Sequence, residues 1–203
     1  MSTDFIMKIL TLGDTAVGKT SIIHRYMETP LPKKSLTTIG VDFRNKIIKI
    51  DQNTKVKLVL WDTAGQERFR NVATNYYNGT DCALLVFDIT NEGSFKILDY
   101  WVKEIQQKKK MDDICLILVG NKSDLSERII TKEESKRLAE EHSIPSFECS
   151  SLTGEGLDDI FNYLAKTLSE RDKNKTDKGG IVFKQKFVFK KEKPPKIYRC
   201  LIY

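Results

Sequence analysis

Two hydrophobic periods alternate along the chain, one typical of strands and the other of helices. Short runs of β-branched and aliphatic residues predict strands at residues 5–12, 41–50, 55–61, 81–88, 114–120 and 147–149. The second and third runs are joined by only four residues, so we expect them to form an antiparallel pair. Elsewhere strands alternate with helix-period segments, which favours an α/β fold with a parallel sheet covered by helices.

Helical spacing fills the segments between these strands. Residues 19–27 predict a helix directly after the first strand, and residues 157–168 predict the last helix. Thr131 and Glu134 have the spacing of a capping box, which marks the start of another helix. One more helix is indicated by apolar residues at helical spacing, namely Phe95, Leu98, Val102 and Ile105.

The strand at residues 55–61 has two different faces. Its apolar face is made of Val56, Leu58 and Leu60. Trp61 falls on the opposite face, together with Lys55, Lys57 and Val59. A tryptophan on a face that carries lysines is either packed under a neighbouring helix or exposed as an anchor for a partner.

Composition places the chain among average soluble domains. Its 203 residues are 40% hydrophobic and 31% charged, which excludes a fibrous or wholly disordered protein. The four cysteines form no Cys-x-x-Cys pair, so we expect free thiols in a reducing compartment. No apolar run reaches the ~18 residues of a spanning helix, and residues 1–4 have neither a basic leader nor a glycine at position 2. We therefore expect no secretion, membrane spanning or N-myristoylation.

Positive charge is concentrated towards the C-terminus. The formal net charge is +6, yet residues 166–203 hold 12 Lys and Arg against four Asp and Glu. The rest of the chain is slightly acidic, so we expect no nucleic-acid partner, which would favour a basic patch on the folded body. The apolar periodicity stops at Arg171, where a polar linker is expected. We place a folded domain at residues 1–170 and a flexible basic tail at residues 171–203.

A glycine-rich loop joins the first strand to the first helix. Residues 13–20 read GDTAVGKT and match the pattern GxxxxGK[ST]. In this pattern the backbone N–H groups and the lysine hold a di- or triphosphate, and the last hydroxyl binds Mg²⁺. The helix that follows adds its dipole to the phosphate site. An ordinary turn between strand and helix is the alternative interpretation.

A second motif follows the third strand at the same expected edge of the sheet. Asp62 comes at the end of this strand, where an acid can hold the metal. Gly65 can donate its N–H to a γ-phosphate, and Gln66 can orient an attacking water. Thr38 stands 19 residues beyond Lys19, in a loop that can close on the same metal.

A third motif, Asn121-Lys122-Ser123-Asp124, follows the strand ICLILVG. The Asp124 carboxylate can accept hydrogen bonds from both N1–H and the amino group of guanine, a pair of donors that adenine lacks. The Lys122 stem can lie against the base. By itself this motif fits a surface loop as well as it fits guanine recognition. Its position after the two motifs above indicates guanine recognition.

Taken in order, GDTAVGKT, TTIG, WDTAGQE, NKSD and Cys149-Ser150-Ser151 resemble the five nucleotide motifs of the Ras superfamily of small GTPases. The segments IGVDF at 39–43, WDTAGQERF at 61–69 and YYNGT at 76–80 are similar to those that mark its Rab branch. The resemblance covers residues 5–170. It implies a P-loop small G domain, with a six-stranded, mostly parallel sheet and helices on both faces, that binds GTP and Mg²⁺ and hydrolyses GTP slowly.

The resemblance also implies roles by position. Phosphate-binding residues would be Gly13, Asp14, Thr15, Ala16, Val17, Gly18, Lys19, Thr20, Ser21, Thr38 and Gly65. Mg²⁺ ligands would be Thr20, Thr38 and Asp62, and Gln66 would position the catalytic water. Guanine-binding residues would be Asn121, which braces the loop, Lys122, Asp124, Ser150, Ser151 and Leu152. An effector patch would include Ile39, Phe43, Trp61, Phe69 and Tyr76.

Three positions depart from the family pattern. Leu31 stands where an aromatic ring usually meets guanine edge-on, and Ser35 stands where a tyrosine often covers the phosphates. Leu152 replaces the usual lysine after Ser151. Because a ring contact contributes about 0.5–1.5 kcal/mol beyond its buried area, we expect GDP release up to roughly tenfold faster than is usual for the family.

The tail ends in Cys200-Leu201-Ile202-Tyr203, which fits the C-a-a-X prenylation pattern, with lysines and an arginine upstream. One prenyl chain anchors weakly, so a basic second signal makes physical sense. An unmodified tail is the alternative. Residues 181–190 alternate aromatic and basic positions, which fits a strand laid on the domain, a membrane-surface segment or a plain spacer.

We interpret the chain as a monomeric small GTPase switch that regulates vesicle traffic. It would be cytoplasmic and cycle to the cytoplasmic face of intracellular membranes. Expected partners are GTP and GDP, an exchange factor, a GTPase-activating protein, effectors, and a membrane surface met through the prenylated basic tail. The departures at Leu31, Ser35 and Leu152 keep a GTP-binding scaffold with little hydrolysis as an alternative. A nucleic-acid-binding protein driven by the basic tail is a second alternative.

Overall fold

The computed structural model describes residues 5–30, 41–52, 54–63, 79–108 and 114–177, the last six of these by backbone only. In chain order the elements are β1 (Phe5–Leu12), α1 (Lys19–Tyr26), β2 (Val41–Lys49), β3 (Lys55–Thr63), β4 (Cys82–Asp88), α3 (Glu92–Lys96), α4 (Leu98–Lys108), β5 (Cys115–Asn121), α5 (Lys132–Glu141), β6 (Ser146–Glu148) and α6 (Leu157–Asp177).

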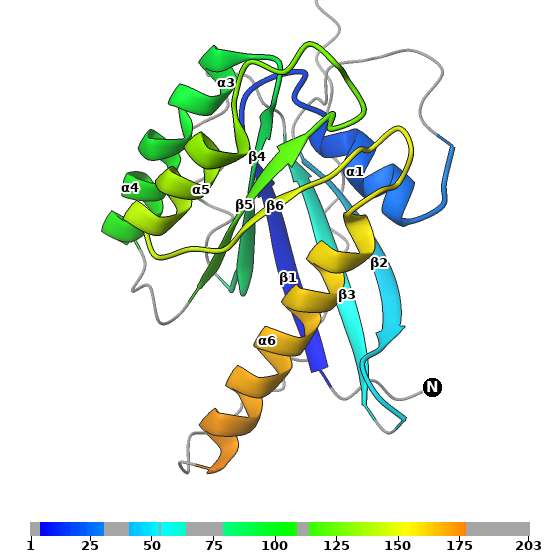
Figure 1. Ribbon diagram of the computed structural model, residues 1–203. Helices are drawn as coiled ribbons and strands as arrows, with labels where there is room; N and C mark the ends of the chain where they lie inside the picture. Colours follow the sequence, from blue (N-terminus) through cyan, green and yellow to red (C-terminus); the bar gives the residue numbers. More distant parts are fainter. Residues whose placement is uncertain (1–4, 31–40, 53, 64–78, 109–113, 178–203) are drawn as a thin grey trace, which may run out of the picture.

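The strands form one sheet, in the order β2-β3-β1-β4-β5-β6 (Figure 1). Only β2 runs antiparallel, and it pairs with β3 as a hairpin. The other neighbouring strands pair in parallel. The six-stranded, mostly parallel sheet and the antiparallel pair that the sequence predicts are therefore confirmed. Parallel strands bring their carboxyl ends to one edge, which is the upper edge in Figure 1.

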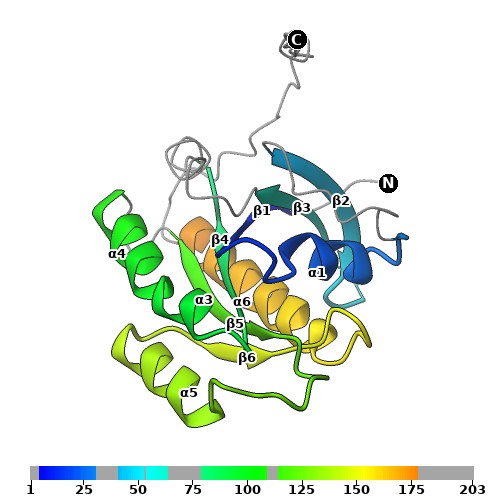
Figure 2. The ribbon, with the colours of Figure 1, turned by 90° about the horizontal axis from the view of Figure 1, so that it is seen from above.

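Helices cover both faces of the sheet (Figure 2). On one face, α1 and α6 bury a core that includes Ile9 from β1 and Phe161 from α6. On the other, α3, α4 and α5 cover a second core that includes Leu10 and Trp101. Ile9 and Leu10 are neighbours in β1 and enter different cores because side chains alternate across a strand. This two-sided arrangement confirms the expected layers.

The helix expected around Phe95 and Ile105 is interrupted by one residue. Asn91 caps the start of α3, and Ile97 separates α3 from α4. Ile97 keeps right-handed helical dihedrals (φ −74°, ψ −12°), and its carbonyl accepts the Trp101 N–H at 3.3 Å. The apolar periodicity continues across the interruption for this reason. The capping box predicted at Thr131 is present, with Thr131 and Glu134 bonded to each other's backbone N–H.

The last helix extends beyond the expected end of the apolar pattern. It continues to Asp177, so residues 171–177 are helical and not the polar linker that the sequence predicted. Polar residues without glycine or proline are compatible with a helix, and the first such breaker is Gly179. Loss of apolar periodicity therefore did not mark the end of the helix. The division into two regions remains a prediction.

The cysteines of the described segments, Cys82, Cys115 and Cys149, are free thiols, as expected. The helices in these segments include none that is both long enough and apolar enough to cross a bilayer.

Candidate functional site

The loop between β1 and α1 is shaped by two glycines that leave no room for a side chain. Gly13 has φ +139°, and a Cβ there would lie 2.1 Å from the carbonyl oxygen of Val86. Gly18 has φ +95°, and a Cβ there would lie 2.2 Å from Nδ2 of Asn121. L-residues with side chains rarely adopt such dihedrals. The glycines of the pattern therefore let this loop lie directly against β4 and β5.

Lys19 lies inside this loop. Its side chain is buried, and its Nζ donates to the carbonyl oxygens of Gly13 at 3.1 Å and Asp14 at 2.7 Å. Burial lowers the pKa of Lys19 to about 8, against the opposing attraction of Asp62 and Asp14. Because burial disfavours the charged form of Lys19, an anion bound beside Nζ would stabilise the ammonium group.

Thr20 and Asp62 meet beside Lys19. The Thr20 hydroxyl donates to Oδ2 of the buried Asp62 carboxylate at 2.6 Å. Asp62 is positioned by the end of β3, where the Thr63 hydroxyl donates to the Thr11 carbonyl at 2.6 Å. A hydroxyl next to a carboxylate is a set of hard oxygen donors, which suits Mg²⁺.

Asn121 joins the phosphate loop to the loop after β6. It is fully buried, and its Nδ2 donates to the Val17 carbonyl at 2.8 Å and to the Ser151 hydroxyl at 3.2 Å. Its Oδ1 accepts the Ser151 backbone N–H at 3.0 Å. One side chain therefore ties together two loops that lie more than 100 residues apart in the sequence.

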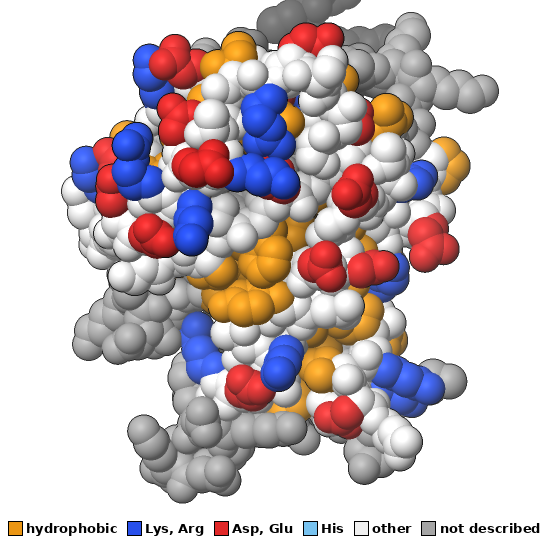
Figure 3. All heavy atoms as spheres, in the orientation of Figure 1, with side chains coloured by type: hydrophobic (Ala, Val, Ile, Leu, Met, Phe, Trp, Pro, Cys, Tyr) orange, Lys and Arg blue, Asp and Glu red, His pale blue; other side chains and the backbone are white. Residues whose placement is uncertain are grey.

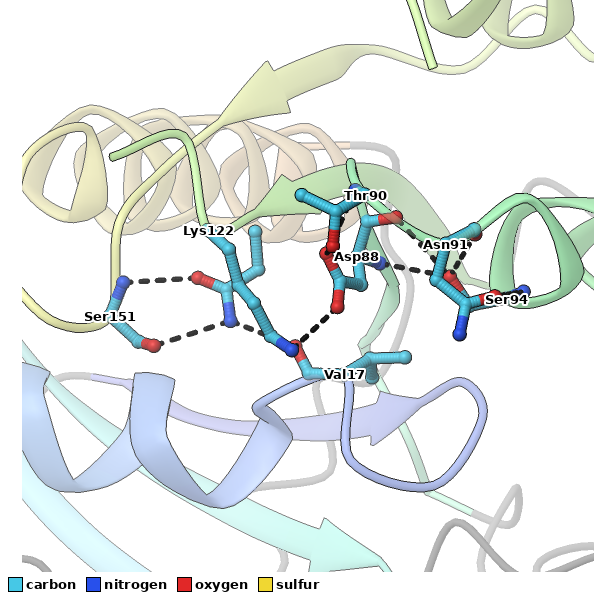
Figure 4. Close-up of polar contacts among 8 residues, drawn as sticks. Val17, Asp88, Thr90, Asn91, Ser94, Lys122 and Ser151 are labelled. Carbon is cyan, nitrogen blue, oxygen red and sulfur yellow. Dashed lines mark hydrogen bonds and ion pairs between the residues drawn. The ribbon is translucent and has the colours of Figure 1, made fainter. Parts of the chain in front are cut away.

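Asp88 is a member of this cluster that sequence reasoning missed. Its Oδ2 pairs with Nζ of Lys122 at 2.5 Å, and its Oδ1 accepts the backbone N–H and the hydroxyl of Thr90 (Figure 4). Burial alone would raise the pKa of the Asp88 carboxyl, but the hydrogen bonds from Lys122 and Thr90 hold it below its usual range. The available signal was one acid at the end of the apolar run CALLVF, in register with Asn121.

The Ser150 hydroxyl connects the two base-side loops. It donates to Oδ1 of Asp124 and accepts the backbone N–H groups of Leu152 and Thr153. Asp124 is exposed beside it, as a ligand-binding carboxylate would be. Leu152 projects outward, with 70% of its surface exposed. The structure thus brings Asn121, Lys122 and Asp124 together with residues 150–152.

Trp61 is half-buried, between the two alternatives that the sequence left open. It packs against the core under α4, and Nζ of Lys8 lies 4.3 Å from its ring centroid. The exposed ring of Phe43 is a further neighbour, with centroids 5.9 Å apart. These two members of the expected effector patch form one aromatic pair on the sheet surface.

The remaining expected site residues lie outside the described residues. They are Leu31, Ser35, Thr38, Ile39, Gly65, Gln66, Phe69, Tyr76 and Cys200. The described positions, from Gly13 to Ser21 with Asp62, Asn121, Asp124 and Ser150, gather at the carboxyl edge of the sheet.

Comparison with known proteins gives consistent matches over most of the chain. A family model described as Ras family matches residues 8–170. The chain is 43% identical to the Ras-related protein SEC4 of Saccharomyces cerevisiae, over 86% of this chain and 80% of that protein. It is 39% identical to the Ras-related protein Rab-1 of Theileria parva, over 83% of this chain and 76% of that protein. It is 41% identical to the Ras-related protein Rab-26 of Bos taurus, over 83% of this chain and 66% of that protein.

Proposed function

The chain belongs to the Ras family as a Rab-type small GTPase, and we propose that the cluster at the carboxyl edge of its sheet is the site that binds and hydrolyses GTP. Proteins of this type are GTP hydrolases that regulate vesicle traffic, with exchange factors, GTPase-activating proteins and effectors as partners. The observation that supports the assignment of the site is the Asn121 bridge, because it holds the loop before α1 next to the loop after β6, as binding of one nucleotide by both loops would require.

At the phosphate end, Lys19 holds the β- and γ-phosphates and the loop N–H groups surround them. The contacts of Nζ with Gly13 and Asp14 support this role, because they fix the amine inside the loop before nucleotide arrives. Such pre-positioned donors need no reorganisation when charge moves in the transition state.

The GTPases of this family generally use Mg²⁺, and the oxygen donors at Thr20 and Asp62 fit it. Bound there, the ion would neutralise charge that develops on the β- and γ-phosphate oxygens. Thr20 and Thr38 would bind it directly, and Asp62 would hold it through water. Gly65 would bind the γ-phosphate, and Gln66 would orient the attacking water. These roles follow from the positions of the residues in the family motifs.

At the base end, Asp124 accepts the two guanine donors and Lys122 lies along the ring. The Ser150 hydroxyl supports this role because it fixes one carboxylate oxygen of Asp124. The backbone of residues 150–152 completes the pocket. An adenine base would offer the carboxylate neither of these donors, which is costly in a site of this kind.

Effectors would dock on the Phe43 and Trp61 rings in the GTP-bound state. Ile39, Phe69 and Tyr76 would complete this patch. Rab-type GTPases act on intracellular membranes. For this chain we propose a cytoplasmic monomer that reaches the cytoplasmic face of such membranes through prenylation of Cys200 and the basic residues before it.

Single-turnover hydrolysis of labelled GTP tests the assignment. We expect Gln66→Leu to abolish turnover stimulated by a GTPase-activating protein while leaving GTP affinity nearly unchanged. Normal stimulated turnover in that variant would remove Gln66 from the mechanism. Competition with ATP tests the base end, since equal competition by ATP would contradict guanine recognition at Asp124.

A further inference from the structure

A basic and aliphatic surface lies at the hairpin end of the sheet, on the side of α4. Strand register builds it in rows: Ile47 and Ile6 both lie next to Lys57, and Lys49 lies opposite Lys55. Side-chain alternation puts all five residues on the face that carries Trp61 and Leu10. We call Ile6, Ile47, Lys49, Lys55 and Lys57 the lysine face.

The aliphatic side chains of this face are unusually exposed. Ile47 is 52% exposed and Ile6 is 43% exposed. In Figure 2, α3, α4 and α5 stand against the other half of the sheet, and no described helix extends over β2 and β3 on that side. Two exposed isoleucines among lysines form an amphipathic surface, which is the composition of segments that sit at a membrane interface.

The charge of the lysine face is nearly all of one sign. Lysines directly opposite each other, as Lys49 and Lys55 are, repel and cost stability. Within the described segments, no carboxylate lies within ion-pair distance of Lys49 or Lys57. The nearest acid in sequence, Asp51, lies in the hairpin turn, where its Oδ1 accepts the Thr54 N–H. By contrast, acidic and basic side chains are interspersed on the face shown in Figure 3.

The position of the lysine face relative to the basic tail favours an anionic surface as the partner of this face. The hairpin and the end of α6 both lie at the lower end of the molecule in Figure 1, away from the nucleotide edge. After α6 ends at Asp177, 26 residues remain, with eight Lys and Arg against one acid, Glu192. An anionic surface that attracts this tail would therefore be drawn to the end of the body that carries the lysine face.

We propose that the lysine face is a second membrane contact, at which the lysines meet the phosphates of anionic lipids and the isoleucines enter the boundary between headgroups and acyl chains. The inference deepens the proposed membrane association and rests on it. The tail supplies attachment, and the face fixes how the body is oriented. In Figure 1 the hairpin end and the nucleotide edge lie at opposite ends of the body, so contact at the hairpin end leaves the nucleotide edge at the far end.

Sedimentation of the full chain with vesicles tests the inference. The probe is phosphatidylserine in phosphatidylcholine, compared with phosphatidylcholine alone. Each lysine near an anionic surface strengthens binding by about fivefold, so K49A/K57A should weaken binding to the anionic vesicles by about 25-fold. Ile47→Ser should give a smaller loss on the same vesicles.

Matched variants separate the face from general charge and exposure. K132A/K136A removes two exposed lysines from α5, and Ile129→Ser removes an isoleucine with 57% exposure, so both should bind nearly as the parent chain does. Equal losses in K132A/K136A would show a general charge effect and would overturn the inference. Unchanged binding of K49A/K57A would also overturn it. The tail is tested separately by K190A/K191A/K193A, so a failure of tail attachment would be recognised as such.

Discussion

The two ends of the nucleotide site are built in different ways. The phosphate end depends on backbone geometry, since Gly13 and Gly18 allow approaches that any Cβ would block. The base end depends on a network of side chains, in which Asn121, Asp88 and Ser150 each hold a neighbour in place. Triphosphate is the same in every nucleotide, whereas the base has to be distinguished by specific donors and acceptors.

This difference predicts different tolerance to substitution. The glycines of the phosphate loop have no conservative replacement, because even the Cβ of alanine would collide with a neighbouring atom. A side-chain network can lose one member and keep part of its function, provided that the others still hold the ligand. Asn121 belongs to both ends, because it contacts the phosphate loop through Val17 and the base-side loop through Ser151.

Gly18→Ala should have the largest effect. The added Cβ would lie 2.2 Å from Nδ2 of Asn121 at φ +95°, so we expect the free energy of unfolding to fall by at least about 3 kcal/mol. Urea unfolding measures this. Gly93→Ala is the matched control, because Gly93 lies in α3 and its nearest neighbour, Oδ1 of Asn91, is 3.2 Å away. Equal destabilisation by both variants would refute the backbone argument.

Asp88→Asn should have the next largest effect, on the base end. Loss of the charged partner frees Lys122, which we expect to weaken guanine binding by about 2 kcal/mol, or about thirtyfold in the dissociation rate of mantGDP. If Asp88 acts through Lys122, the double variant D88N/K122A should release nucleotide no faster than K122A alone. Asp99→Asn, which removes a half-exposed acid of α4, should leave the rate unchanged. Additive effects in the double variant would assign Asp88 a purely structural role.

Leu31→Phe should have a smaller effect in the opposite direction. A ring at this position would restore an edge-on contact with guanine, and we expect mantGDP to dissociate up to roughly tenfold more slowly. An unchanged dissociation rate would show that Leu31 does not limit nucleotide retention.

A change of pH should have the smallest effect, at the phosphate end. In the free protein the pKa of Lys19 is about 8, and a bound polyphosphate raises it, so binding takes up protons once the pH exceeds about 8. Between pH 7 and 8.5 we expect GDP affinity to fall by about fourfold. Calorimetry in buffers of different ionisation enthalpy measures the proton uptake. Binding without proton uptake at pH 8.5 would show that Lys19 is already fully charged in the free protein.

Local patterns were sufficient for most of the fold. Strand length, periodicity and the capping box at Thr131 depend on neighbouring residues, so the sequence predicted six strands and most helix starts. The apolar pattern was wrong about helix boundaries at two places, because the apolar stripe and the helical backbone do not end at the same residue there. In α6 the helix continues after its apolar stripe has ended, and at Ile97 a helix is interrupted while its stripe continues.

The sequence by itself determined which chemistry the chain carries, because GDTAVGKT and NKSD specify donors, acceptors and glycines at fixed local spacing. Only the tertiary structure decided how these motifs are joined. The contacts of Asn121 with Val17 and of Asp88 with Lys122 link residues far apart in the sequence. Register between strands likewise gathered Ile6, Ile47 and Lys57 into one row. Contacts of this kind depend on how strands pair and on which loops meet, and no local spacing encodes that.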